Sequence, residues 1–203
     1  MSTVKLSIIY YSATGTNHQL SLWADEAAQE NGAEVRRRIV AETAPQEAIN
    51  ANPAWKKFRE EVADHETVAT LDDLSWADAI LFCMPTRYGN LPSQMQAYID
   101  TTGPLWAKGA LVNKLVSGIT SSMNPQGGQE STLMALYKIM AHWGAIIVPQ
   151  GYTDNIVFAS GGNPLGTSAT IDKNGNILNK DAVKQTVQHQ VKRLLSIAKK
   201  IKG

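Results

Sequence analysis

Six consecutive small or polar residues follow the first apolar segment of the chain and could bind an anion. They are Ser12, Ala13, Thr14, Gly15, Thr16 and Asn17. Residues 4–11 before them resemble a strand in composition, and apolar residues recur at helical spacing after them until Asn31 and Gly32. The six residues would therefore open a helix, whose unpaired backbone N–H groups and positive dipole end attract an anion. The same residue types also suit a simple turn and helix cap.

The composition of this turn limits the kind of phosphate that it would suit. It has no Lys followed by Ser or Thr, as in loops for nucleoside triphosphates, and no Gly-x-Gly-x-x-Gly spacing, as in dinucleotide-binding loops. Neutral donors without a cation suit a terminal phosphate monoester, and FMN carries one. We therefore expect FMN as the cofactor if other loops can surround its ring.

Two further polar loops could do so. One spans residues 85–90 and the other residues 120–130, and each follows a short apolar run. Glycines in these loops would let backbone groups approach a flat ring closely. Tyr88 could pack against one face of a flavin ring, and Trp106 and His142 could border the space over the other face. The flavin would supply the redox chemistry, and the protein would position it.

The elements between the loops must bring them together. Strand-like segments alternate with helical patterns, which predicts an α/β fold with a doubly wound, five-stranded parallel sheet and helices on both faces. In such sheets ligands bind beyond the carboxyl ends of the strands, where the strand order reverses. Three donor-rich loops would converge at that edge, so we expect the site there. The expected strands are residues 4–11, 34–40, 79–84, 115–119 and 145–149.

We expect residues 1–203 to form a single domain. Residues 41–75 are polar and predict an insertion of short helices. Residues 151–179 are long for a simple connection, and such segments usually cover a site or an interface.

Asn, Pro and Gly residues typical of helix starts and stops predict where several helices begin and end. Asn52-Pro53 resembles a cap followed by the first helical position. A helix is expected from about Pro92, and Gly103-Pro104 is expected to end it. The last helix starts near Lys180 and carries its apolar residues along one stripe.

The composition excludes several classes of protein. Hydrophobic residues make up 43% of the chain, and no apolar run approaches the roughly 20 residues of a membrane-spanning helix. The chain enters a strand almost at once, which leaves no room for a signal peptide. The single cysteine, Cys83, lies in a strand-like run, so we expect a core residue in a reducing compartment. These features predict a cytoplasmic protein without membrane insertion.

Charge and motifs exclude further classes. A net charge of +1 argues against nucleic acid as a partner. The cluster Arg36-Arg37-Arg38 lies in an edge-like strand and is best explained as protection of an exposed sheet edge. The sequence has no Cys or His cluster with metal-ligand spacing, so we expect no metal, and no Gly-x-Ser-x-Gly motif of a serine hydrolase.

Five motifs, in order along the chain, resemble those of the WrbA-type NAD(P)H:quinone oxidoreductases, which are FMN proteins of flavodoxin-like fold. The likeness spans nearly the whole chain, and the loop 85–90 is its most specific part. The motifs are Tyr10-Tyr11-Ser12 with the following loop, Pro85-Thr86-Arg87-Tyr88-Gly89-Asn90, Gly103-Pro104-Leu105-Trp106, Gly127-Gly128-Gln129-Glu130 and Ala141-His142-Trp143-Gly144.

The resemblance implies a role for each loop. It implies a phosphate site from Ser12 to Asn17 and a nicotinamide contact near Thr14. Trp106 matches a residue that borders the quinone and nicotinamide space, and His142 matches a flavin-site histidine that could help to protonate the product. The implied ring contacts are Thr86, Arg87 and Tyr88. The other implied cofactor-binding residues are Gly89, Ser122, Met123, Asn124, Pro125, Gln126 and Gly127.

The chain departs from the family pattern at three places. Thr14 stands where the family often has Tyr, and Trp143 stands where a second His is common. The third loop reads Met-Asn-Pro-Gln at 123–126 in place of a Gly- and Thr-rich run. These departures concern the preferred electron donor more than FMN binding.

The resemblance implies that NADH or NADPH reduces a quinone through FMN, with donor and quinone in the same cleft in turn, as in ping-pong kinetics. It also implies a homotetramer, a dimer of dimers, in which neighbouring subunits complete each site. One alternative is a one-electron flavodoxin-type carrier, although a nearly neutral chain does not favour docking by charge steering. Another is a non-catalytic flavin-binding regulatory partner, but no helix carries the basic residues of a DNA reader.

Overall fold

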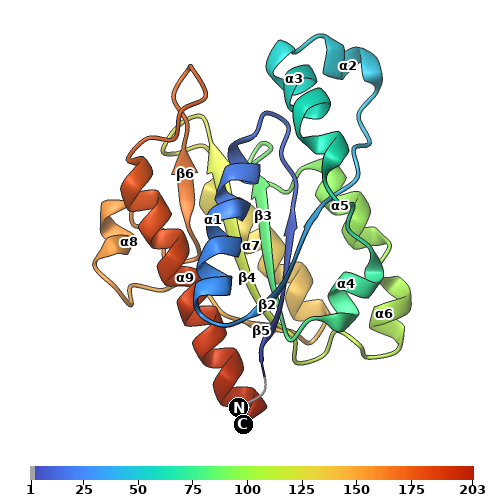
Figure 1. Cartoon of the computed structure of the whole chain (residues 1–203), viewed down its shortest axis with the longest axis vertical. Helices are drawn as coiled ribbons and strands as arrows, with labels where there is room; N and C mark the ends of the chain where they lie inside the picture. Colours follow the sequence, from blue (N-terminus) through green and yellow to red (C-terminus); the bar gives the residue numbers. More distant parts are fainter. Residues whose placement is uncertain (1–2) are drawn as a thin grey trace.

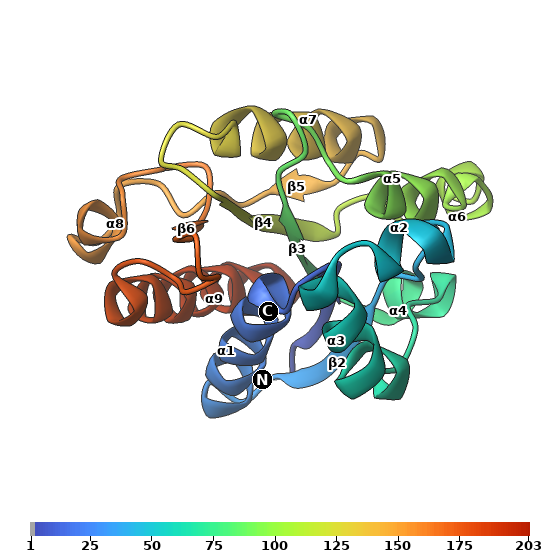
Figure 2. The same cartoon turned by 90° about the horizontal axis from the view of Figure 1, so that it is seen from above.

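A parallel β-sheet lies between two layers of helices in the computed structural model, which describes residues 3–203 (Figures 1 and 2). The sheet has the order β2-β1-β3-β4-β5, the flavodoxin-like arrangement, and the order reverses between β1 and β3. The predicted doubly wound, five-stranded parallel sheet is confirmed. The strands are β1 (Lys5–Tyr10), β2 (Glu34–Ile39), β3 (Ala79–Pro85), β4 (Leu115–Ser122) and β5 (Ile146–Ile147).

The central strands are buried on both faces, as their continuous apolar composition predicts. Every residue of β3 and β4 is buried. Side chains alternate along each strand and so fill two cores, one on each side of the sheet. In β1, Ile8 and Tyr10 belong to one core and Ile9 to the other.

Different helices cover the two faces (Figure 2). On one face lie α1 (Thr16–Glu30) and α9 (Lys180–Lys202), and the apolar stripe of α9 from Val183 to Ala198 is buried. On the other face lie α4 (Leu71–Trp76), α5 (Ser93–Asp100) and α7 (Gln129–His142). Within residues 3–203, no helix has both the length and the apolar character needed to cross a bilayer.

The predicted N-terminal cap at Asn52 forms, and the insertion lies beside the end of the sheet where the strands finish. Asn52 Oδ1 accepts hydrogen bonds from the backbone N–H of Ala54 at 3.1 Å and of Trp55 at 3.2 Å. Figure 1 shows α2 and α3 at the end of the molecule where the strands finish. The insertion contains α2 (Gln46–Asn50), α3 (Pro53–Glu61) and a 3-10 turn, η1 (Ala63–His65), and leads into α4.

The structure differs from the expected elements at three places. The dipeptide Gly103-Pro104 begins the short helix α6 (Gly103–Ala107), because proline is tolerated in a first helical turn. The fifth strand keeps only two residues, β5. The connection 151–179 contains α8 (Ile156–Ala159) and a short strand, β6 (Ser168–Thr170), which pairs in parallel with the end of β4. Three small residues carry too little periodicity to predict such a strand.

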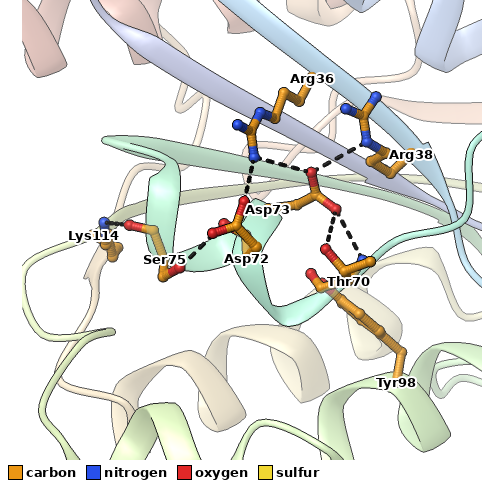
Figure 3. A network of polar contacts seen from close by, with 8 residues as sticks. All are labelled: Arg36, Arg38, Thr70, Asp72, Asp73, Ser75, Tyr98 and Lys114. Carbon is orange, nitrogen blue, oxygen red and sulfur yellow. Dashed lines mark hydrogen bonds and ion pairs between the residues drawn. The ribbon is translucent and has the colours of Figure 1, made fainter.

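The arginine-bearing strand β2 lies at the sheet edge, and ion pairs attach it to α4 (Figure 3). Arg36 lies 2.8 Å from Asp72, and Arg38 Nε lies 3.1 Å from Asp73 Oδ1. Asp73 is only 3% exposed, and its Oδ2 accepts hydrogen bonds from the backbone N–H and hydroxyl of Thr70, which completes a capping box at α4. These residues therefore tie an exposed edge to its neighbouring helix.

Candidate functional site

A cleft of about 560 Å³ opens at the carboxyl edge of the sheet, and all three predicted loops line it. The first loop follows β1, the second follows β3 and the third follows β4, which are adjacent strands. The lining residues of these loops are Ser12, Ala13, Thr14, Thr16, Asn17, Pro85, Thr86, Arg87, Tyr88, Ser121, Ser122, Met123, Asn124 and Gly127.

The first loop presents free backbone donors. Gly15 caps α1 with φ +96°, a conformation that glycine adopts at little cost, and its N–H donates to Ser12 Oγ at 3.0 Å. The backbone N–H groups of Thr14, Thr16 and Asn17 have no protein acceptor among residues 3–203. These groups and the helix dipole suit an anion.

The side chain of Asn17 has a structural partner. Its Nδ2 donates to Ser121 Oγ at 2.9 Å, in a buried contact between α1 and the end of β4. Cys83 lies behind this contact, with its Sγ 3.4 Å from the Asn17 carbonyl oxygen. Complete burial raises the pKa of the Cys83 thiol, which is the inert core residue that its sequence context predicts. Asn17 thus holds the first and third loops together and has its backbone N–H left for a ligand.

The second loop is a tight turn that projects Tyr88. Arg87 and Asn90 exchange backbone hydrogen bonds of 2.8 and 3.0 Å. Tyr88 and Gly89 between them have φ values of +53° and +77°, as in a type I′ turn. A positive φ is rare for an aromatic residue and costs conformational energy. The Tyr88 side chain is fully exposed at the rim of the cleft.

The second and third loops touch through their glycines. A Cβ on Gly128 would lie 2.6 Å from Gly89 Cα, so only glycine permits this approach. Thr132 Oγ1, in the first turn of α7, lies 2.7 Å from Thr86 Oγ1 and donates to the Gly128 carbonyl at 2.9 Å. The cleft is therefore preformed by hydrogen bonds and close backbone packing.

Residues outside the three loops also line the cleft, and sequence reasoning missed them. They are Asn52 and Trp55 of the 41–75 insertion and Ile171, just after β6. Trp55 is visible in the sequence only as part of an apolar helix face. Nothing in the sequence places that face beside the first loop.

Trp106 and His142 do not line this cleft. Trp106 Nε1 donates to the carbonyl of His142 at 3.1 Å, so the two residues lie together. His142 ends α7, which runs from the carboxyl end of β4 back to the start of β5, so both residues lie toward the end of the sheet away from the cleft. Four other expected contacts lie beside the cleft. Gly15 and Gly89 form turns of its loops, and Pro125 and Gln126 line a separate cavity of about 400 Å³.

Known proteins match this chain along almost its whole length. Residues 4–155 match the family model described as NADPH-dependent FMN reductase. The chain belongs to this family. It is 48% identical over 200 residues to the NAD(P)H dehydrogenase (quinone) of Deinococcus radiodurans, with 98% of each chain covered. It is 37% identical over 204 residues to the enzyme of the same name from Brucella abortus, with 98% of this chain and all of the relative covered.

Solved structures show the same fold. A WrbA-like flavodoxin from Agrobacterium tumefaciens has a TM-score of 0.68 at 17% identity and covers 98% of this chain and 99% of its own. An archaeal flavodoxin has a TM-score of 0.58 at 14% identity, with 98% and 99% covered. The family match, the relative at 48% identity and this shared fold together confirm the predicted resemblance to the WrbA-type FMN proteins.

The residues of this FMN reductase family member fit the cofactor of the family. The cleft has the size of small-molecule sites, which run from about 300 to 1,000 Å³. One end offers the free backbone donors of the first loop for a phosphate. The remaining walls combine Trp55, Tyr88 and Met123 with small polar residues, which suits a flat, mainly apolar ring with a polar edge.

Proposed function

We propose that this protein binds FMN in the cleft and uses it to reduce a quinone with NADH or NADPH. The observation that carries this proposal is the single cleft that the start of α1 and the loops after β3 and β4 line together. Membership of the NADPH-dependent FMN reductase family and 48% identity to an enzyme named NAD(P)H dehydrogenase (quinone) support it. When bound, the flavin supplies the transfer of hydride and electrons.

The residues of the chain would bind and orient the reactants. Backbone groups between Ser12 and Asn17 would hold the phosphate, and the preformed second and third loops would hold the ring. Tyr88 at the rim would border the space that the nicotinamide and the quinone occupy in turn. One shared space for two substrates predicts ping-pong kinetics.

Cofactor titration tests the phosphate assignment. Hydrogen bonds to a charged group contribute about 1.5–3 kcal/mol. We therefore expect FMN to bind at least about tenfold more tightly than riboflavin, which lacks the phosphate. Equal affinities would contradict the role of the first loop.

The FMN-loaded protein should oxidise NADH or NADPH with benzoquinone present, and initial rates should give parallel reciprocal plots. No turnover with either donor would refute the activity.

We also propose that a second copy of the chain completes the site. Trp106 is 61% exposed and lies with His142 away from the cleft of its own chain. Trp106 and His142 can therefore border a cleft only if they belong to a neighbouring subunit. The connection 151–179 exposes stacked rings of Tyr152 and Phe158, whose centroids are 5.0 Å apart, and suits an interface. We expect light scattering to give a homotetramer of single-domain chains. A monomer with full activity would refute this arrangement.

The expected location of the protein is the cytoplasm. The buried, single cysteine supports a reducing compartment. Fractionation of the native cells with an antibody to the protein tests this expectation, and recovery from an oxidising compartment would contradict it.

A further inference from the structure

Trp55 is a wall of the cleft that comes from outside the three loops. It lies in the first turn of α3, and Asn52 is the other residue of the 41–75 insertion that lines the cleft. Its side chain is half-buried and packs against the core cluster on the face of the sheet that α5 and α7 cover. Trp55 lines the cleft together with Ser12, Ala13 and Thr14 of the first loop.

A single carboxylate fixes the orientation of the indole. Trp55 Nε1 donates to Glu42 Oε2 at 3.1 Å, and the Tyr11 hydroxyl donates to the same oxygen at 3.1 Å. Burial, together with the Glu42 charge, raises the pKa of Tyr11, so its phenol stays protonated and keeps donating. The indole therefore cannot leave the cleft wall without losing a charge-assisted hydrogen bond.

The other oxygen of Glu42 holds the carboxylate itself in place. Glu42 Oε1 accepts from Gln94 Nε2 of α5 at 2.6 Å and from the backbone N–H groups of Thr43 at 3.0 Å and Ala44 at 2.9 Å. The donors to Glu42 come from Tyr11, which directly follows β1, from the insertion and from α5. A carboxylate held by this many groups is a rigid support for the ring that it holds.

The backbone of α3 is anchored to the first loop as well. A Cβ on Gly15 would lie 3.6 Å from Phe58 Cδ2, one helical turn beyond Trp55, so α3 packs closely on the loop. The Asn52 cap holds the other end of the same turn. Trp55 is thus held by its helix and by its side chain.

From this arrangement we propose that Trp55 contacts the planar ring of the flavin along the wall that α3 builds, and that Glu42 is the residue that positions it. An aromatic side chain held in this way supplies a large apolar surface with little loss of conformational freedom on binding. The inference rests on the proposed function, because it takes the cleft to hold FMN.

Emission of bound FMN tests the contact directly. Tryptophan in contact with a flavin quenches its fluorescence by electron transfer, and phenylalanine does not. Because Tyr88 lines the same cleft and tyrosine also quenches flavins, the comparison is made in a Tyr88→Phe background. We expect bound FMN to be dark in that protein and several-fold brighter, with a longer decay, when Trp55→Phe is added. Trp55→Ala should also weaken FMN binding roughly 2- to 10-fold. Trp76→Phe is the matched control, because Trp76 of α4 packs its ring against the Arg36 guanidinium and does not line the cleft.

Glu42→Gln tests the positioning role. The amide has the shape of the carboxylate but only one acceptor oxygen, so either the indole or the backbone donors lose their partner. In the same Tyr88→Phe background, we expect the bright, long-lived flavin component to appear in this variant although Trp55 is present. An unchanged decay would contradict the role of Glu42. Circular dichroism and thermal melting identify variants that fold.

The outcomes separate the inference from the proposed function. If the native protein binds no FMN, both are refuted. If it binds FMN but Trp55→Phe in the Tyr88→Phe background leaves emission and decay unchanged, the Trp55 contact is refuted and the cofactor assignment stands. A loss of affinity without any change in emission also refutes the contact, because it shows that Trp55 only supports the fold.

Discussion

Gly128 is the residue at which the second and third loops come closest, and its replacement by alanine should spread them apart. A Cβ there would lie 2.6 Å from Gly89 Cα and 2.9 Å from Gly89 N, far inside normal contact. The obstacle is backbone, which cannot rotate away as a side chain does. Gly128 also has φ +92°, which alanine adopts only with strain.

The two effects can be separated with a matched control. Gly32 has φ +75°, but nothing lies within 4 Å of its added Cβ. Gly32→Ala should therefore show the backbone strain alone, about 1 kcal/mol. Gly128→Ala should add the cost of overpacking, about 1–3 kcal/mol. We expect a total loss of about 2–4 kcal/mol in the free energy of unfolding for Gly128→Ala.

Urea unfolding followed by circular dichroism measures both losses, and FMN titration measures the effect on the cleft. Gly128 approaches Gly89 where the two loops that we propose to hold the flavin ring meet. Gly128→Ala should therefore also weaken FMN binding, and Gly32→Ala should not. Equal losses of stability in the two variants would refute the close approach of the loops. Unchanged FMN affinity in Gly128→Ala would contradict their proposed role in holding the ring.

Three further changes test other parts of the structure. Tyr88→Asn creates the Asn-Gly pair that type I′ turns prefer, so it should raise the free energy of unfolding by about 0.5–1 kcal/mol in urea melts. The same change should weaken FMN binding. A lower free energy of unfolding would contradict the strain at Tyr88. Asp73→Ala should lower the free energy of unfolding by about 2–4 kcal/mol, because Arg36, Arg38 and the N-terminal cap of α4 lose their buried partner. A loss below about 1 kcal/mol in the same melts would contradict this role of Asp73. Burial lowers the pKa of His18 from 6.5, despite its hydrogen bond to Glu66, so the unfolded chain binds the proton more tightly. Stability should therefore be complete above pH 6.5 and fall as the pH drops through that value, and urea melts of His18→Gln should show a flatter profile over this window; an identical profile would refute the assignment.

Local patterns in the sequence predict most elements of the fold. The buried runs that form β3 and β4, the stripe of α9 and the Asn52 cap depend on residues within one or two turns of one another. Their positions can be read from periodicity and capping preferences for this reason. The error at Gly103-Pro104 is also local, because the same dipeptide can end one helix or begin another.

Features that depend on distant residues could not be predicted. The short strand β6 forms only because the end of β4 offers a free edge to it. The separation of Trp106 and His142 from the cleft follows from the direction of α7 across the sheet. Neither fact leaves a signal in the few residues concerned.

The sequence by itself determined that three donor-rich loops lie at one edge, because parallel strands joined by helices all end on the same side. The tertiary structure alone decided what closes that edge. Glu42 gathers Tyr11, Trp55 and Gln94, which lie 31, 13 and 52 residues from it, around one carboxylate. Such contacts form only when the chain has folded, since the free energy that holds them comes from packing between elements and not from the preferences of any one segment.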